Sequence, residues 1–318
     1  MLSKQFFLIF FLLVSCRQFT PKENENICKL KIIHAGSLTV PIKIICDSFK
    51  NRFPQVQIYT EACGSKQCAR NIAELNKKFD IFVSADYKII DQMLIPHYAT
   101  WNIPFAGNEM AIVYNEKSKY SNKINENNWF DILLKKDVAI GRSDPNSDPC
   151  GVRAILTIKL AEKHYQLNGL SNQLLSKDLS NIRPKETDLL ALLETNTIDY
   201  VFLYKSVALQ HHLNFISLPD EINLKNPMFN DLYNTVSVEV NGSKPGEKKT
   251  EKGEPMVYGI TILSNSYNQK LAEAFVYFSL TKGLEILRAN GQQTIVPSVT
   301  STFKNIPIRL QKFAKPQQ

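Results

Sequence analysis

The chain has 318 residues, of which 44% are hydrophobic and 21% are charged. This balance is typical of a folded protein of about two domains, at roughly 150 residues per domain, and excludes a disordered chain, a collagen-like fibre and a multi-span membrane protein. The net charge is +8, but four basic residues lie within 304–318 and no basic stripe with interleaved aromatic residues occurs elsewhere, so we expect no nucleic-acid partner.

Residues 1–15 have the layout of a signal peptide. Lys4 precedes an apolar run over 6–14, which is too short for a membrane span of about 20 residues. The sequence Leu-Val-Ser-Cys that ends at Cys16 resembles the lipobox of bacterial lipoproteins, which implies cleavage before Cys16 and lipid attachment to it. A plain signal peptide with an incidental cysteine is the alternative. The polar residues 16–27 would form a tether, which predicts a lipid-anchored protein on the outer face of the cell membrane.

Five cysteines remain after Cys16, and their spacing fits no zinc site because no C-x-x-C occurs. Cys63 and Cys68 could form a disulfide across a short loop, but the sequence leaves the pairing among Cys28, Cys46, Cys63 and Cys68 open, and the odd number, with Cys150, leaves at least one free thiol. The chain also has no Gly-rich nucleotide-binding motif. We therefore expect no cofactor.

The first half of the chain alternates short apolar runs with amphipathic stretches, which predicts an α/β unit with a mostly parallel sheet. Apolar residues recur at steps of four, three and four from residue 38 to residue 49, as on one face of a helix. The predicted strands are 30–33, 56–59 and 81–83, each followed by a helix, and a new unit begins at 110–114.

The second half repeats this pattern less regularly and then returns to the first unit. The predicted elements are a strand at 138–140, a turn at 141–145, helices at 152–165 and 187–194, a strand at 200–203, a helix start at 205–212, a solvated loop at 241–254, a strand at 256–263 and a helix at 268–290 that Gly291 ends. We expect two lobes, 28–108 plus 264–318 (lobe I) and 109–263 (lobe II), joined near 107–115 and 256–264.

Three of the predicted strand-to-helix turns could bind an anion. They are Gly36-Ser37, Gly64-Ser65 and Pro149-Cys150-Gly151. Each would expose backbone N–H groups at the positive end of a helix dipole. Singly, each turn could equally be an ordinary N-cap. Because ligands bind at the carboxyl ends of parallel strands, turns of this kind on two lobes predict a ligand cleft between them.

At these residues the chain resembles the periplasmic tungstate/molybdate-binding proteins that serve ATP-driven importers, in particular the branch also found in archaea. The matching motifs follow one another over nearly the whole chain beyond the tether. They are His34-Ala35-Gly36-Ser37-Leu38, Gly64-Ser65 with Ala69-Arg70, residues 80–87 (DIFVSADY), residues 143–151 (SDPNSDPCG), residues 183–187 (RPKET), Ile198-Asp199-Tyr200, residues 204–208 (YKSVA) and Tyr258-Gly259-Ile260-Thr261.

The resemblance implies a type II periplasmic-binding-protein-like fold, α/β with mixed, mostly parallel sheets flanked by helices, and a role for each matching residue. Ser37 and Ser65 would bind oxyanion oxygens, with Gly36 allowing close approach. In lobe II, the backbone of the Pro149-Cys150 turn and the Tyr204 hydroxyl would do the same.

Two carboxylates, Asp148 and Glu186, match residues that in this branch bond the metal centre of the oxyanion. A carboxylate beside a bound dianion is repelled unless it coordinates the metal, which tungsten and molybdenum allow and sulfur does not. The pair would thus favour the larger oxyanions over sulfate and phosphate. The alternative is that Asp148 caps the helix at Val152 and Glu186 caps the helix at Asp188, both on the surface.

The sequence therefore predicts a monomeric lipoprotein that captures tungstate or molybdate between its lobes and delivers it to the permease and ATPase of an ABC transporter. It would be no enzyme. The first alternative is a binding protein for sulfate or another tetrahedral oxyanion. The others are an extracytoplasmic hydrolase that uses Ser37 or Cys150, although no complete nucleophile–base set is present, and an adhesin that uses the basic residues 304–318.

Overall fold

The computed structural model describes residues 28–242 and 246–317. The predicted signal peptide (1–15), lipid attachment at Cys16 and tether (16–27) lie outside the described residues and stay predictions. Within the described part, no helix combines the length and the hydrophobicity that crossing a bilayer takes.

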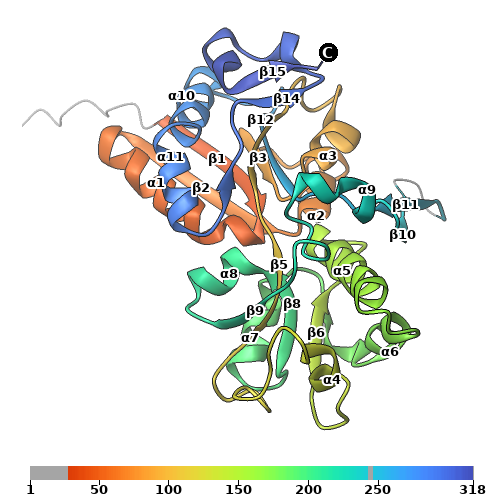
Figure 1. The fold of residues 1–318 in the computed structure, drawn as a ribbon. Helices are drawn as coiled ribbons and strands as arrows, with labels where there is room; N and C mark the ends of the chain where they lie inside the picture. The colour runs from red at the N-terminus through yellow and green to blue at the C-terminus, as the bar shows by residue number, and fades with distance from the viewer. Residues whose placement is uncertain (1–27, 243–245, 318) are drawn as a thin grey trace, which may run out of the picture.

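The first of two large sheets has six strands in the order β13-β4-β12-β3-β1-β2 (Figure 1). β1 pairs in parallel with β2 and β3, and the other pairings are antiparallel. The strands are β1 Cys28–Ala35, β2 Val56–Cys63, β3 Ile81–Ser84, β4 Ile103–Gly107, β12 Val257–Ile262 and β13 Gln293–Thr294.

Helices cover this sheet, because apolar residues on both faces of its central strands must be buried. Phe49 of α1, for example, packs edge-on against Phe275 and Phe278 of α10, with ring centroids 5.1 and 5.5 Å away. The elements around the sheet are the 3-10 turn η1 Gly36–Leu38, α1 Thr39–Arg52, α2 Ser65–Ala73, α3 Tyr87–Ile89, the π turn η2 Ile90–Leu94, α10 Gln269–Ser279 and α11 Lys282–Ala289.

The second sheet has five strands in the order β7-β6-β8-β5-β9, of which β7, β6 and β8 run parallel and β5 and β9 complete it with antiparallel pairings. The strands are β5 Met110–Tyr114, β6 Ile140–Ser143, β7 Ile182–Arg183, β8 Tyr200–Tyr204 and β9 Asn214–Ser217. The surrounding elements are α4 Trp129–Leu133, α5 Pro149–Tyr165, α6 Leu170–Ser176, η3 Leu179–Asn181, α7 Asp188–Glu194, α8 Lys205–Gln210, η4 Pro227–Phe229 and α9 Asn230–Tyr233.

The α/β class with mixed sheets and flanking helices is confirmed, but the expected excess of parallel pairings is not found. Four of the nine pairings in the two large sheets are parallel. The antiparallel pairings all involve β5 or one of β4 and β12. These strands lie next to the connections between the sheets, and they run antiparallel to the strands that belong to the strand–helix units.

The chain passes between the sheets at Asn108–Glu109, which join β4 to β5, and again at 253–256 before β12. The predicted boundary after residue 263 would place β12 in lobe II, but β12 lies between β3 and β4. We therefore use lobe I for the residues around the six-stranded sheet and lobe II for those around the five-stranded sheet. Asn108 Nδ2 donates to Tyr258 OH on lobe I (2.6 Å) and to Ser206 Oγ on lobe II (2.7 Å).

Two element boundaries differ from the prediction for local reasons. Residues 141–143 of the predicted turn at 141–145 are the end of β6, and the turn begins only at residue 145. Gly141 serves close packing instead: a Cβ there would lie 2.8 Å from Ile198 Cδ1. The predicted helix 268–290 is two helices, since the Thr281 hydroxyl donates to the Tyr277 carbonyl (2.8 Å) where the helix breaks. Gly291, at a φ of +84°, ends the second helix as predicted.

The predicted loop at 241–254 is largely one arm of a hairpin. β10 Ser237–Asn241 pairs antiparallel with β11 Lys248–Lys252. Val238 and Val240 of β10 are buried in the core of lobe II, while β11 lies at the level between the lobes in Figure 1. The hairpin is therefore an arm of lobe II that reaches the side of lobe I.

The basic C-terminal residues pack against lobe I. β14 Ser298–Thr300 pairs in parallel with β15 Ala314–Pro316, and the 3-10 turns η5 Phe303–Asn305 and η6 Ile308–Phe313 lie between them. Lys312 Nζ donates to Tyr277 OH (2.8 Å), and the Arg309 guanidinium lies 4.3 Å above the same ring. The segment is thus packed on lobe I as far as residue 317 and is no free tail.

Candidate functional site

The two predicted anion-binding turns of lobe I, after β1 and β2, lie beside the turn after β3 because the strands before them are in register. Ala35 at the end of β1 pairs with Cys63 at the end of β2, and His34 pairs with Val83 of β3. Gly36, Gly64 and Ala85 therefore follow at the same edge of the sheet, as expected for parallel strands.

Lobe II presents a matching edge. Ser143 of β6 pairs with Arg183 of β7, and Gly141 pairs with Val201 of β8, so these strands end together. Asp148 and Glu186 lie in the segments that follow β6 and β7, and Tyr204 is the last residue of β8. The residues predicted on lobe II, which are far apart in sequence, are thus brought to one place.

The two edges face each other and touch. A Cβ built on Gly36 would lie 3.0 Å from Glu186 Oε1, and one built on Gly64 would lie 2.6 Å from the carbonyl oxygen of Ser147. The predicted site residues are all buried: Gly36, Ser37, Ser65, Asp148, Pro149, Cys150, Glu186 and Tyr204. The lobes are therefore closed over the site. A side chain at 64 would collide with the backbone of lobe II, whereas one at 36 would press on the side chains of Glu186 and Thr187.

This contact predicts that Gly64→Ala will weaken ligand binding without unfolding the protein. The new methyl group would meet the Ser147 carbonyl only when the lobes close, so closure should cost about 1–3 kcal/mol, or roughly 5- to 150-fold in affinity. Isothermal titration with an oxyanion measures the effect. Gly283→Ala in α11 is the control, because it lies away from the site and the nearest atom to its Cβ would be the end of the flexible Ile45 side chain, at 3.2 Å. Equal affinity of Gly64→Ala and wild type would contradict a closed binding state.

Three hydroxyl groups of the site each accept a hydrogen bond from the protein. Ser65 Oγ accepts from the Ala85 N–H (2.9 Å), Ser37 Oγ accepts from Tyr258 OH (3.3 Å), and Tyr204 OH accepts from Arg153 Nη1 (3.1 Å). Among the described residues none of the three has an acceptor for its own hydrogen. Each hydroxyl is therefore oriented and retains a hydrogen to donate, which is what binding the oxygens of an anion takes.

Asp148 is committed to backbone N–H groups through both oxygens. Oδ1 accepts from the Cys150 N–H (3.0 Å) and caps α5, and Oδ2 accepts from the Glu186 N–H (2.8 Å). The capping alternative is thus right about the cap, but wrong about a surface position, because Asp148 is 1% exposed. Asp148 positions Glu186 and begins α5 at the same time.

Glu186 is buried with one oxygen unsatisfied. Its side chain is 1% exposed, and Oε1 has no hydrogen-bond partner in the structure. Burial raises its pKa well above 4.5, and the neighbouring Asp148 raises the pKa further, while the backbone N–H groups of Glu186 and Ser37 act in the opposite sense. A buried, unpaired carboxylate oxygen is costly to keep. The alternative that Glu186 caps a helix on the surface is therefore wrong about its position, and the predicted ligand role stays a prediction.

Cys150 contributes no nucleophile. Its thiol is fully buried with Sγ 3.8 Å from the Phe202 carbonyl, and burial, followed by Asp148 and Glu186, raises its pKa. Its backbone N–H, predicted to bind a ligand, donates to Asp148 Oδ1 here, so that role stays a prediction. The hydrolase alternative also lacks a base at Ser37, because His34 Nδ1 bonds to the Ala35 carbonyl (2.8 Å).

Sequence reasoning missed three residues of the site: Asn108, Arg153 and Tyr258. All three are buried. Arg153 did leave a signal, because it is a lone charged residue among the apolar residues 152–158 of α5. Tyr258 belongs to a motif that carried the resemblance, but its strand was assigned to the wrong lobe. Nothing in the sequence distinguishes Asn108 from other polar residues.

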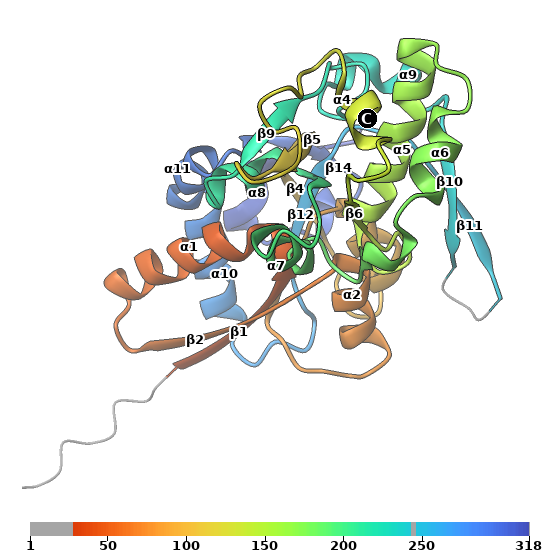
Figure 2. The same ribbon diagram turned by 90° about the horizontal axis from the view of Figure 1, so that it is seen from below.

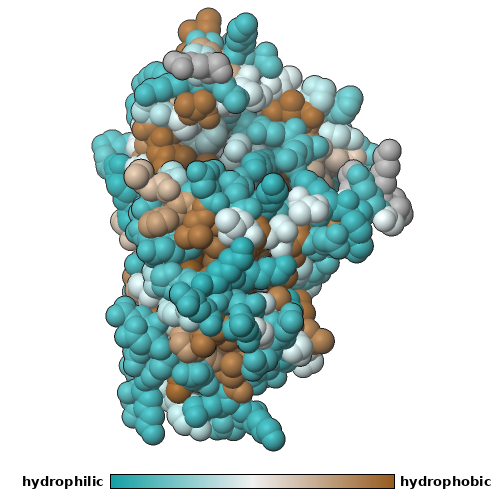
Figure 3. Space-filling model, turned by 45° about the vertical axis from the view of Figure 1, so that its right-hand side comes forward, coloured by the Kyte–Doolittle hydropathy of each residue, from teal (hydrophilic) through white to brown (hydrophobic). Residues whose placement is uncertain are grey.

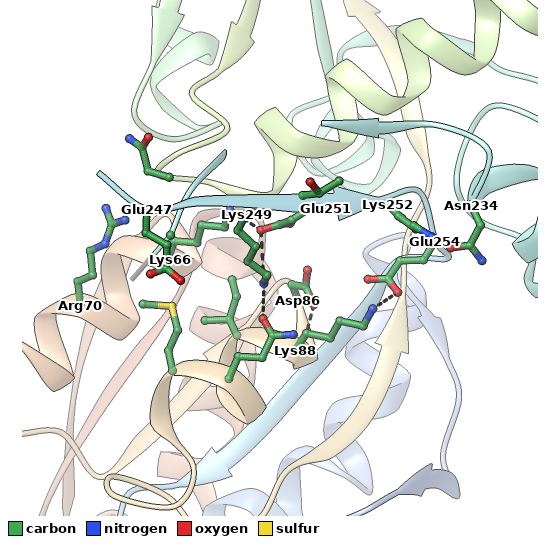
Figure 4. Close-up of a pocket in the computed structure, with 16 residues that line it drawn as sticks. Lys66, Arg70, Asp86, Lys88, Asn234, Glu247, Lys249, Glu251, Lys252 and Glu254 are labelled. Carbon is green, nitrogen blue, oxygen red and sulfur yellow. Dashed lines mark hydrogen bonds and ion pairs between the residues drawn. The ribbon is translucent and has the colours of Figure 1, made fainter. Parts of the chain in front are cut away.

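A cavity lies beside this site and not within it. It has a volume of about 560 Å³ and lies between the hairpin arm and lobe I (Figure 4). Lys66 of lobe I pairs with Glu251 of β11 (2.8 Å), and Lys88 pairs with Glu254. The cavity walls thus carry salt bridges between the two lobes. No group of three or more His, Cys, Asp or Glu residues among those described could hold a metal ion.

The sequence left the disulfide pairing open, and the structure has the Cys63–Cys68 bond, which encloses the Gly64-Ser65 turn, while Cys46 and Cys150 keep their thiols. We expect the bond to hold the turn in its binding conformation, so reduction or Cys63→Ala/Cys68→Ala should weaken oxyanion binding by about 3- to 10-fold through lost preorganisation. Titration with and without reductant measures this. Reductant must leave the double variant unchanged; an unchanged affinity of the reduced wild type would contradict the role.

A family model described as bacterial extracellular solute-binding protein matches residues 30–293. An uncharacterized solute-binding protein of Petrotoga mobilis is 44% identical over 289 residues, which are 90% of either chain. The molybdate/tungstate-binding protein WtpA of Pyrococcus abyssi is 39% identical over 328 residues, which cover 94% of either chain.

Two solved structures share the fold. The periplasmic molybdate-binding protein of Azotobacter vinelandii aligns with a TM-score of 0.61 at 15% identity over 84% of this chain and 99% of that chain. The sulfate-binding protein SubI of Mycobacterium tuberculosis aligns with a TM-score of 0.59 at 14% identity over 91% of this chain and 92% of that chain. The predicted two-lobed periplasmic-binding-protein-like fold is confirmed.

Proposed function

Because the chain belongs to the family of bacterial extracellular solute-binding proteins, we propose that it binds molybdate or tungstate between its lobes and delivers the anion to an ABC importer. The observation that carries this proposal is the combination of three oriented hydroxyl donors with a buried carboxylate oxygen that has no partner. The resemblance to relatives named for these two anions supports it.

The donor set fits a heavy oxyanion better than the alternatives. Ser37, Ser65 and Tyr204 would bind the oxygens of the anion, and Glu186 Oε1, with Asp148, would coordinate the metal centre and expand four oxygens towards six. Sulfate and phosphate offer no such coordination, and a buried carboxylate would repel them. A bare cation would not use the three hydroxyl donors in this way.

No bond of the anion would be broken in this role, so the protein would need no catalytic group and no cofactor. Hinge motion at the two connections would open and close the lobes. We propose that the protein acts as a monomer held by the lipid on Cys16, and that the permease and ATPase of the importer supply the energy for transport.

Isothermal titration of the purified protein with tungstate, molybdate, sulfate and phosphate tests the proposal. Tungstate or molybdate should bind at least about 100-fold more tightly than sulfate, since the carboxylates discriminate by charge. X-ray absorption of the complex should then give a six-coordinate metal. Tight sulfate binding with weak tungstate binding would instead establish the sulfate alternative, and a four-coordinate metal would remove Asp148 and Glu186 from the ligand set.

A further inference from the structure

Arg153 is a buried charge that the proposed ligand set leaves unexplained. It lies one turn into α5 of lobe II and is 5% exposed. In the described part of the chain, Arg153 and Lys66 are the only buried lysine or arginine residues. Lys66 belongs to the salt bridges at the cavity, so Arg153 is the buried cation beside the site.

The guanidinium connects the site to the opposite lobe. Nη1 donates to Tyr204 OH (3.1 Å), and Nη2 lies 3.4 Å from Asp86 Oδ2. Asp86 belongs to lobe I, where its Oδ1 caps α3 by accepting the Lys88 N–H (2.9 Å). Asp86 also lines the cavity at the wall that lobe I supplies (Figure 4). Arg153 can therefore reach Asp86 only while the lobes are closed.

The contact with Tyr204 determines which way the phenol can bond. A guanidinium has donors and no acceptor, so Tyr204 OH must accept from it. Burial raises the pKa of Tyr204 well above its usual value, so the phenol keeps its hydrogen at neutral pH. With its lone pair directed to Arg153, the hydroxyl hydrogen is left for a ligand.

The charge of Arg153 also matters in a closed, dry site. Asp148, Glu186 and a dianion would place several negative charges together, and burial strengthens their repulsion. Arginine is the suitable counter-charge because it stays protonated: burial lowers its pKa, but Tyr204 and Asp86 raise it above its ordinary value overall.

We propose, on the basis of the proposed function, that Arg153 is a positioning and charge-balancing residue that couples oxyanion binding to closure of the lobes. It holds Tyr204 as a donor to the anion, offsets the negative charge of the occupied site, and forms its ion pair with Asp86 as the lobes meet. A ligand in the site thereby favours the closed form, because the Arg153 side chain contributes both to ligand binding and to the contact between the lobes.

The test compares tungstate affinities of wild type, Arg153→Met, Tyr204→Phe, Asp86→Asn and the Arg153→Met/Tyr204→Phe double variant by isothermal titration. We expect Arg153→Met to weaken binding by at least about 30-fold and Tyr204→Phe by about 10-fold. Because Arg153 acts in part through Tyr204, removing the Tyr204 hydroxyl should add little once Arg153 is gone, and the double variant should be within about 3-fold of Arg153→Met. Arg142→Met is the matched control, since Arg142 Nη2 donates to the Leu175 carbonyl and takes no part in the site.

Closure gives an independent readout. In small-angle scattering with saturating tungstate, Asp86→Asn should retain a larger radius of gyration than wild type, and unfolding of each ligand-free variant shows that it is folded. Should Arg153→Met not fold, Arg153→Lys takes its place and should bind more weakly than wild type, since an ammonium cannot bond Tyr204 and Asp86 in the same fork.

Two results would overturn the inference while the wild type still binds tungstate. One is an Arg153 variant that binds within about 3-fold of wild type, and the other is fully additive losses in the double variant. A wild-type protein that binds neither tungstate nor molybdate would instead refute the proposed function, so the two failures are distinguishable.

Discussion

Replacing Glu186 with glutamine should abolish tungstate binding and, at the same time, stabilise the ligand-free protein. Glutamine has nearly the same shape but cannot supply a charged oxygen to the metal centre, so affinity should fall by at least about 100-fold. The loss corresponds to roughly 2.7 kcal/mol or more. This is the largest effect on binding that the site predicts for a change that conserves its packing.

The gain in stability follows from the raised pKa of Glu186. The unfolded chain would ionise this carboxyl near 4.5, whereas burial and Asp148 keep it protonated to higher pH in the folded protein. Below about pH 4.5 the carboxyl is protonated in both the folded and the unfolded protein, so it does not favour unfolding. As the pH rises from there towards the raised pKa, only the unfolded protein ionises the carboxyl, and the folded protein loses stability. Glu186→Gln removes that loss, so at pH 8 the ligand-free variant should be more stable than wild type.

Chemical denaturation of ligand-free wild type and Glu186→Gln between pH 4 and pH 8 measures the difference. The two curves should meet at the acid end and separate as the pH rises. Glu194→Gln is the control, because Glu194 lies at the end of α7 and is exposed. A variant that is less stable than wild type at pH 8 would contradict the assignment of an ionisation penalty to Glu186.

Replacing Asp148 with alanine should abolish binding too, but with the opposite effect on stability. Its two oxygens accept the N–H groups of Cys150 and Glu186. Loss of a helix cap costs about 1 kcal/mol, and leaving a buried N–H without a partner costs about 1–3 kcal/mol more. Ligand-free Asp148→Ala should therefore be less stable than wild type by about 2–4 kcal/mol.

The same denaturation experiment measures this loss, with Asp188→Ala as the control. Asp188 is also at the start of a helix, but its ion pair with Lys185 (3.5 Å) is half exposed, so its loss should cost less than about 1 kcal/mol. If Asp148→Ala and Asp188→Ala lose equal stability, the two backbone contacts of Asp148 contribute little. The opposite effects of the two substitutions on ligand-free stability would distinguish their roles. Asp148 stabilises the structure of the site, whereas the Glu186 carboxylate is satisfied only when the ligand is bound.

The sequence predicted the order of strands and helices well, because burial imposes clear apolar patterns on this chain. It also predicted the turns that face each other across the lobes, because the resemblance to the tungstate/molybdate-binding proteins implied that Gly36, Asp148 and Glu186 belong to one site. It failed where tertiary contacts override local pattern. Gly141 looks like a turn residue, but it is a glycine because Ile198 packs against it. β12 could be placed in the correct sheet only by its pairing with β3 and β4.

Partnerships between side chains could not be predicted either. Whether Asp148 caps a helix or contacts a ligand looked like a choice, yet the structure has it capping α5 from a buried position beside Glu186. The cavity under the hairpin arm likewise depends on residues from both lobes, and a polar segment such as 241–254 gives no sign of it. The face in Figure 3 is mostly hydrophilic, with its hydrophobic residues in separate patches.

The hydrogen bonds of Asn108 have a consequence for size discrimination. A continuous chain of hydrogen bonds runs from Ser206 through Asn108 and Tyr258 to Ser37, and Asn108 itself lies in one of the two connections between the sheets. An anion that displaces Ser37 would therefore also disturb the connection at Asn108, where we propose that the lobes hinge. With an anion of the wrong size, the rotation of the two lobes would thus stay incomplete. An importer that docks only the fully rotated form would not accept that anion.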